Sequence, residues 1–118
     1  MYSFEKLEVW QLGRHIRIRI YRLCIQFPDS EIFGLISQMK RASHSITHNL
    51  AEGSGRETKK DKAHFTIISK GSALELLDQI IAAHDLEFIS ASQYADLRKD
   101  MDLLINKLNA FYAYQTKQ

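Results

Sequence analysis

Arginine side chains gather on one side of the first amphipathic segment and are the clearest candidates for binding a charged ligand. At 100° per residue, Arg14, His15, Ile18, Arg19 and Arg22 occupy the arc opposite the apolar stripe, with almost no acid among them. Guanidinium forks pair with phosphate oxygens through two hydrogen bonds, so a nucleic-acid backbone is the natural polymeric ligand.

Lysines just before residue 63 can extend this surface if that end of their helix lies near the arginines, and helix N-termini themselves favour anions. We therefore expect phosphate contacts from seven side chains: Arg14, Arg17, Arg19, Arg22, Lys59, Lys60 and Lys62. The alternative is a solvated face whose charges serve solubility or pair with acids of the last segment, such as Asp96, Asp100 and Asp102. No aromatic residue is placed beside the basic face by the pattern, so the sequence gives no argument for base stacking.

Two histidines on the second segment have the spacing of metal ligands. His44 and His48 are four residues apart and Glu52 stands one turn further on, but a zincin motif would need Glu where Ser45 stands. No spacing assigns a third ligand, so an exposed or intersubunit polar face is the favoured interpretation. We expect no metal site and no cofactor.

The serines, glycines and the single cysteine do not form a catalytic pattern. The run Gly53-Ser54-Gly55-Arg56 follows a helix rather than a strand and lacks the second glycine of a P-loop, so it is interpreted as a helix terminator. Gly71 lies inside a helix, where glycine is less stable than alanine, and a close approach by a neighbouring helix would compensate this loss of stability. Cys24 falls in an apolar stripe and is expected to be a buried thiol. The sequence therefore predicts no catalytic residue and no enzyme.

The elements that position these residues are four amphipathic helices. They are expected over residues 7–27, 31–52, 58–88 and 90–114, with Pro28 ending the first and Asp29 or Ser30 capping the second. Thr58 with Asp61 and Ser90 with Gln93 resemble capping boxes at the third and fourth starts. Short connections between long helices predict an all-α, antiparallel up-down-up-down four-helix bundle, a single domain over residues 1–118.

The third helix is apolar over more of its circumference than a bundle core requires. Phe65, Ile68, Leu76, Ile80 and Ala83 form one stripe, and others spread beyond it: Ile67, Leu74, Leu77, Ile81 and Phe88. Exposed apolar surface of this kind usually marks an interface, so we expect a homo-oligomer. The alternative is that the first helix and the C-terminal tail cover the excess.

Charge and composition fit a small cytoplasmic protein. The net charge is +2, but residues 1–70 hold twelve basic and seven acidic side chains while residues 71–118 hold four and seven. This asymmetry can steer an anionic partner, or bring the basic part of one copy to the acidic part of another. No signal peptide, membrane anchor or membrane-spanning run is expected.

Motifs spread along nearly the whole chain resemble a known family. They are Phe4, Leu7, Val9-Trp10-Gln11, Phe27-Pro28, Glu31, Phe33-Gly34-Leu35, Gln38, Lys40-Arg41-Ala42, Ser45-Ile46, Asn49-Leu50-Ala51-Glu52-Gly53-Ser54-Gly55-Arg56, Phe65, Gly71-Ser72 and Leu74-Glu75-Leu76. Together they resemble the bacterial four helix bundle proteins, also called 23S rRNA-intervening-sequence proteins. Lys40 and Leu50 stand where that family often has Arg and Ile.

The resemblance implies a four-helix bundle that assembles as a ring-like homopentamer. It also implies similarity to the accessory protein of diversity-generating retroelements, a basic pentamer that binds nucleic acid and a reverse transcriptase. Four residues are then expected to hold helix ends or subunits together: Arg41, Asn49, Glu52 and Arg56. The resulting hypothesis is a non-enzymatic accessory protein that binds RNA or DNA, and the alternative is a protein-protein interaction scaffold.

Overall fold

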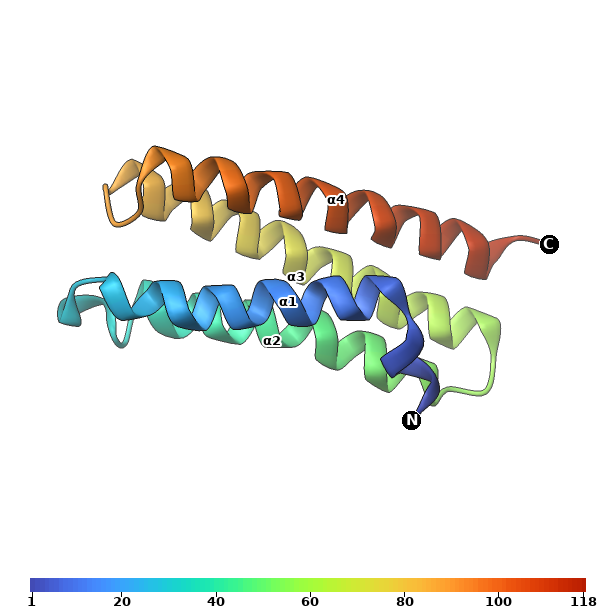
Figure 1. Cartoon of the computed structure of the whole chain (residues 1–118). Coiled ribbons are helices and arrows are strands. Elements are labelled where there is room, and N and C mark those ends of the chain that lie inside the picture. The colour runs from blue at the N-terminus through green and yellow to red at the C-terminus, as the bar shows by residue number, and fades with distance from the viewer.

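The computed structural model describes residues 1–118 and consists of four long helices. They are α1 (Glu8–Leu23), α2 (Leu35–Ser54), α3 (Lys59–Asp85) and α4 (Ala91–Thr116), with short 3-10 helices at Ser3–Lys6, Cys24–Gln26 and Asp29–Glu31. Figure 1 shows that consecutive helices run in opposite directions, so α1 and α3 start at the end of the bundle where α2 and α4 finish. The all-α four-helix bundle predicted from the sequence is therefore confirmed. No helix combines the length and apolar character that crossing a membrane requires.

The capping residues explain where α3 and α4 begin. The Thr58 hydroxyl accepts a hydrogen bond from the Asp61 backbone N–H at 3.1 Å. Ser90 and Gln93 form a reciprocal box, in which each side chain accepts from the other's backbone N–H at 2.9 and 3.0 Å. These contacts satisfy backbone donors that a helix start leaves without partners. The box expected of Ser90 with Gln93 is confirmed, whereas that of Thr58 with Asp61 is only half formed, because the Asp61 side chain does not accept from the Thr58 backbone N–H.

The first two helices are shorter at their facing ends than predicted. The chain tightens into a 3-10 turn after Leu23, so α1 stops before Phe27. The expected caps, Asp29 and Ser30, lie in a separate 3-10 turn and do not cap α2. Instead α2 starts after Gly34, and the Glu31 carboxylate accepts from the Leu35 backbone N–H at 3.2 Å. The Pro28 turn thus takes up more chain than a direct helix-to-helix link would.

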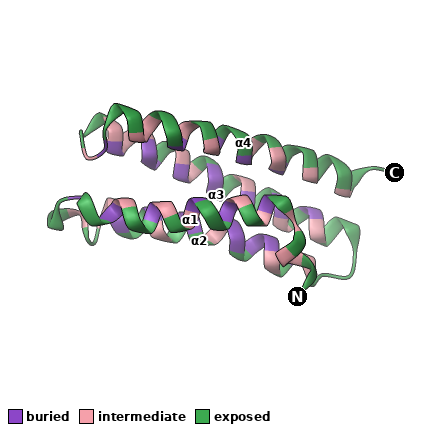
Figure 2. Ribbon diagram, in the orientation of Figure 1, coloured by how far each residue is buried: buried purple, intermediate pink, exposed green.

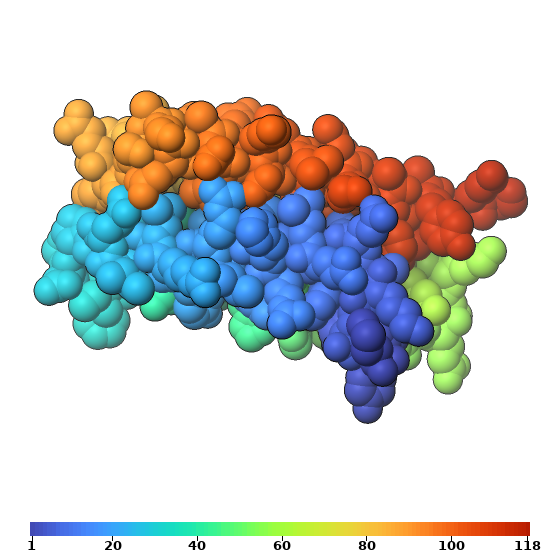
Figure 3. Space-filling view, in the orientation of Figure 1, coloured from blue at the N-terminus to red at the C-terminus, as the bar shows by residue number.

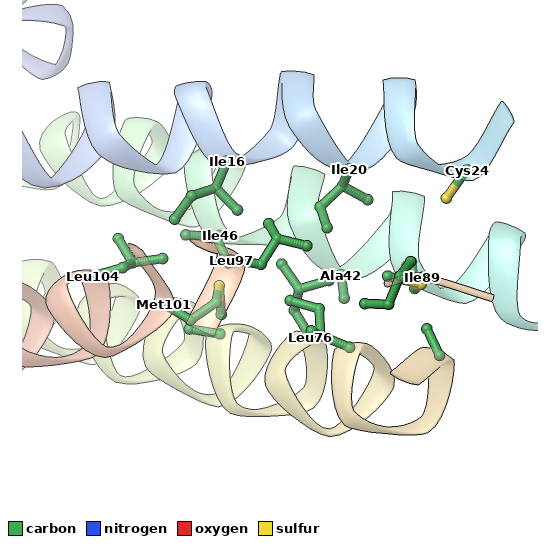
Figure 4. Packing of buried hydrophobic residues seen from close by; sticks show 14 of the residues in the cluster. Ile16, Ile20, Cys24, Ala42, Ile46, Leu76, Ile89, Leu97, Met101 and Leu104 are labelled. Atoms are coloured by element: carbon green, nitrogen blue, oxygen red, sulfur yellow. The ribbon is translucent and has the colours of Figure 1, made fainter. Parts of the chain in front are cut away.

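One core of 19 buried apolar residues runs along the inside of all four helices. Ile16 and Ile20 of α1 meet Ile46 of α2, Leu76 of α3 and Leu104 of α4 in its middle (Figure 4). The burial pattern in Figure 2 places buried residues on the inward side of each ribbon and exposed ones outside. The buried positions of α1, α2 and α4 recur at three- and four-residue steps, as expected of the amphipathic helices predicted from the sequence.

Glycine and serine set the close packing of α2 against α3, which is the most extensive helix contact in the molecule. A Cβ on Gly53 would stand 2.7 Å from the Cβ of Phe65, so this glycine serves helix packing. Gly53 and Ser54 remain inside α2, which corrects their interpretation as a terminator. Gly71 shows the reverse: it is exposed, and a Cβ there would meet nothing within 4 Å. The expectation that a neighbouring helix of the same chain approaches Gly71 closely is therefore wrong.

Candidate nucleic-acid interface

The positive charge lies on two adjacent helices. Residues 9–51 contain six Arg and Lys side chains and only two acids, Asp29 and Glu31. Both acids lie in the turn that joins α1 to α2. The helical stretches on either side of this turn, residues 9–23 and 35–51, therefore contain no acid. We call the side chains of these two helices that carry positive charge and form no ion pair the α1–α2 basic face: Arg14, Arg17, Arg22 and Lys40.

Contacts across the α1–α2 seam fix part of this face. The Arg17 guanidinium donates to the Thr47 hydroxyl on α2 at 2.8 Å. The helices come close here because Gly13 has no side chain; a Cβ there would stand 3.1 Å from the Thr47 methyl. Arg17 is thereby held between the two helices with part of its guanidinium open to solvent.

Aromatic rings lie under two of the cations, and the sequence pattern did not predict these contacts. The Arg14 guanidinium carbon lies 5.6 Å from the centre of the Trp10 ring, and the Lys40 ammonium lies 5.1 Å from that of Tyr21. Tyr21 is 42% exposed. A cation over an aromatic ring is attracted by the ring's negative face. Arg14 follows Trp10 by one helical turn, a signal available in the sequence, whereas the Lys40–Tyr21 pair depends on how α1 and α2 align.

One of the four arginines expected on α1 to contact phosphate is neutralised. Arg19 donates to the carboxylate of Asp100 on α4, and its side chain is only 29% exposed. His15 approaches the same carboxylate at 3.9 Å. For Arg19, the alternative of pairing with an acid of the last helix is therefore confirmed.

Arg22 is exposed, forms no ion pair, and lines a shallow hollow between α1 and α4 with Gln26 and Gln93.

The expected lysines gather at the other end of the bundle from Arg22. Lys59, Lys60 and Lys62 lie in the first turn of α3, at the end where α1 begins, whereas Arg22 lies in the last turn of α1. They do not extend the arginine surface toward Arg22. Instead they surround a hollow of about 540 Å³ and a neighbouring one of about 400 Å³, together with Lys117 of the α4 tail. Figure 3 shows the two chain segments projecting together at this end.

The four residues expected to hold helix ends or subunits make contacts within the chain. Arg41 donates to Glu75 of α3 at 2.6 Å, and Arg56 pairs with Glu52 at 3.2 Å on the last turn of α2. The Arg56 guanidinium also lies 4.6 Å from the centre of the Phe65 ring. Asn49 donates to the backbone oxygen of Ser45 at 2.8 Å and to its hydroxyl at 3.0 Å. Three of these residues therefore stabilise the α2–α3 packing or the α2 end, and Asn49 is part of a buried polar seam.

That seam continues across the helix interface. The Ser45 hydroxyl shares a hydrogen bond with the Ser72 hydroxyl at 2.8 Å, and the Ser69 hydroxyl donates to the backbone oxygen of Ile46 at 2.8 Å. Buried hydroxyls need such partners, because an unsatisfied polar group is costly in the interior. Because these hydroxyl groups bond between α2 and α3, we assign Ser45, Ser69 and Ser72 a structural role.

The histidines and the cysteine do not assemble a reactive site. His48 approaches Glu52 at 3.5 Å, and the rings of His44 and His48 meet edge to face. No three His, Cys, Asp or Glu side chains come together as metal ligands. Burial raises the pKa of the Cys24 thiol, opposed in part by the charge of Lys40. A thiol held in its neutral form is a poor nucleophile.

An apolar strip remains uncovered on α3. Ile67, Ile68 and Leu74 are between 38% and 48% exposed and flank the exposed Gly71. Ile68 was expected in the core, but Ser69 and Ala73 take the inward positions there. The expectation that one copy leaves part of the α3 apolar surface open is therefore met.

Comparison with known proteins supports the same architecture. The sequence profile described as 23S rRNA-intervening sequence protein matches residues 5–110. A solved structure of a protein of unknown function from the S23 ribosomal protein family of Bacteroides thetaiotaomicron superposes with a TM-score of 0.79. The two chains are 20% identical, and the match covers 88% of this chain and 97% of that one. At this identity the likeness concerns the fold alone. No curated protein matches the sequence.

Proposed function

The chain belongs to the 23S rRNA-intervening sequence protein family, and we propose that it is a non-enzymatic, oligomeric accessory protein that binds RNA or DNA through the α1–α2 basic face. The proposed setting is the bacterial cytoplasm, where such nucleic acids occur and where a free cysteine such as Cys24 stays reduced.

The observation that carries the proposal is the excess of basic over acidic side chains on two packed helices, which contain no acid over residues 9–23 and 35–51. The four side chains of the face add positive charge along two packed helices of a molecule about 46 Å long and 24 Å wide. Arg14 and Arg22 are exposed without an acidic partner, and Arg17 is anchored by a neutral hydroxyl, so its charge is not cancelled. Phosphate contacts made by such groups supply affinity without reading sequence. Binding with little sequence preference is therefore expected.

The rings under Arg14 and Lys40 support the same use of the face. A guanidinium held against an aromatic ring loses less rotamer entropy when it meets a phosphate, because it is already partly ordered. Basic side chains interleaved with aromatics are typical of surfaces that bind nucleic acids.

Oligomerisation is proposed from the strip on α3. A helix that exposes Ile67, Ile68 and Leu74 in a row gains free energy when a second copy covers them. Gly71 in their midst would let the neighbouring backbone come near, which would compensate the cost of a glycine inside a helix. The ring of five copies implied by the resemblance is our proposal for the assembly.

A protein-interaction scaffold is the second candidate function, and a separate observation favours it. Ile25 and Phe33 are 84% and 96% exposed in the turn region between α1 and α2. Exposed large apolar side chains of this kind suit a protein partner. Capture of a defined protein from nuclease-treated lysate, with no nucleic acid retained by the untreated sample, would favour the scaffold over the leading proposal.

Charge reversal tests the leading proposal directly. Arg14→Glu and Arg22→Glu each remove a cation that makes no ion pair, so the fold should tolerate them. We expect each to weaken binding of a labelled RNA or DNA duplex roughly fivefold or more at about 100 mM salt. The matched control is Lys99→Glu, the same charge change at an exposed position of α4. If all three variants bind as the unaltered protein does, the face is not the interface.

A further inference from the structure

The hollow at the end of the bundle has the dimensions of a ligand site. It is open to solvent, lies between the first turns of α3 and the last turns of α4, and has a volume of about 540 Å³, with a neighbouring hollow of about 400 Å³. Both are lined by Lys59 and Lys117. Volumes of a few hundred Å³ are typical of sites that take a small molecule or one unit of a polymer.

Its charge is positive and uncompensated. Lys59, Lys60 and Lys117 line the larger hollow, and none of them forms an ion pair. Glu57 and Asp61 are close in sequence, but neither lines either hollow. Cations at the start of a helix oppose its dipole, so this grouping does not stabilise α3. It creates a region where an anion is attracted.

Ring surfaces lie among these lysines. His64 and Tyr112 line the larger hollow, and Tyr114 lines its neighbour. Tyr112 is 37% exposed and Tyr114 is 76% exposed. Every nucleobase can stack on such a ring, whatever its identity, and stacking on aromatic side chains is a main source of affinity for single strands. A duplex cannot use these rings, because its base faces are covered by the neighbouring base pairs.

We propose that this end hollow binds an unpaired stretch or strand end of a nucleic acid. Phosphates lie against Lys59, Lys60 and Lys117, and a base stacks on Tyr112 or Tyr114. The inference rests on the proposed function, since it assumes that the protein meets nucleic acid at all, and it names an unpaired strand as the ligand at this second surface. The α1–α2 basic face then takes the backbone of a paired segment, and the end hollow takes the strand that leaves it.

The test compares a short oligothymidylate with an abasic strand of the same length and charge. We expect the oligothymidylate to bind at least about fivefold more tightly, because only it can stack. Tyr112→Leu and Tyr114→Leu should reduce that ratio toward one while binding of the abasic strand persists. The matched control is Tyr21→Leu, which removes a tyrosine of α1 that is 42% exposed, close to the 37% of Tyr112, and should leave the ratio unchanged. A ratio of one for the unaltered protein, or loss of the ratio only in Tyr21→Leu, overturns the inference.

Charge variants separate this inference from the proposed function. Lys59→Gln with Lys117→Gln should weaken oligothymidylate more than duplex, whereas Arg14→Glu with Arg22→Glu should weaken duplex more than oligothymidylate. If duplex binding depends on the arginines but oligothymidylate does not depend on the lysines, the inference fails and the proposed function stands. If neither ligand binds, both fail. Photocrosslinking with a 5-iodouracil strand gives a readout that needs no substitution: adducts on Tyr112 or Tyr114 are expected, and adducts confined to Trp10 or Tyr21 contradict the proposal.

Discussion

Arg19 on α1 donates a hydrogen bond to the carboxylate of Asp100 on α4, and this pair joins the two helices at the edge of the α1–α2 basic face. Both side chains are about three-quarters buried, at 29% and 25% exposed. The pair therefore cancels one positive charge beside a surface where Arg14 and Arg22 form no ion pair. It also limits how far the proposed interface extends toward α4.

Releasing Arg19 should strengthen nucleic-acid binding. In Asp100→Asn the guanidinium keeps a neutral acceptor and regains its net charge, so affinity for a duplex should rise and the salt dependence should steepen by up to about one phosphate contact. Fold stability should fall by about 0.5–1 kcal/mol in urea unfolding. The control is Asp102→Asn, whose carboxylate pairs with Arg98 on α4 itself at 3.2 Å. Equal affinities for both variants would mean that Arg19 lies outside the interface.

The two helical glycines should respond in opposite ways to an added methyl group. Gly53→Ala forces a Cβ to 2.7 Å from that of Phe65, so α2 and α3 must move apart. We expect a loss of about 1–3 kcal/mol in the free energy of unfolding. Gly71→Ala meets nothing within 4 Å and should leave the fold as stable or more so. Urea denaturation of both variants measures the free energy of unfolding. A Gly53→Ala protein as stable as the unaltered one would show that α2 and α3 do not pack closely at Gly53.

The strip on α3 should control self-association. Leu74 and Leu103 are almost equally exposed, at 48% and 46%, but only Leu74 belongs to the strip. Leu74→Asp should therefore shift the protein toward monomer in sedimentation equilibrium, because it places a charge in the apolar contact. Leu103→Asp, on α4, should leave the assembly intact. A monomeric unaltered protein, or dissociation by both variants alike, would refute the assignment of the strip.

Cys24 should be protected from alkylation in the folded protein. Burial raises the pKa of its thiol, so at pH 8.5 the folded chain holds less thiolate than the unfolded chain, in which a thiol of ordinary pKa is about half ionised. The side chain also lies at the edge of the core with only 4% of its surface exposed (Figure 4). Reaction with iodoacetamide should be at least about tenfold slower in buffer than in concentrated guanidinium chloride. Equal rates would place the thiol at the surface.

The sequence predicted the helices well because the core is periodic and the caps are local. The stripe from Leu97 to Leu108 and the box of Ser90 with Gln93 each depend on residues within one helix. The start of α2 was missed because the Pro28 turn forms a separate 3-10 segment before Gly34. Gly53 was interpreted wrongly as a helix terminator, because the need for glycine there comes from close packing against Phe65, twelve residues away.

The candidate site was only partly predictable, because it depends on how the helices are rotated against one another. A helical wheel places Arg19 opposite the apolar stripe, but it cannot show that Asp100 comes within hydrogen-bond reach. The same holds for Lys40 above Tyr21 and for Lys117 beside Lys59, which are distant in sequence. The arginines Arg14 and Arg22 were found because exposure on a single helix follows from its period.

The salt dependence of duplex binding tests the central claim most directly. If Arg14, Arg17, Arg22 and Lys40 contact phosphates, the logarithm of the binding constant should fall with the logarithm of salt concentration, with a slope of about −4 between roughly 50 and 200 mM. The slope should become shallower by about two when Arg14 and Arg22 are both changed to Glu. A slope near zero, or no measurable binding at about 50 mM salt, would contradict the account.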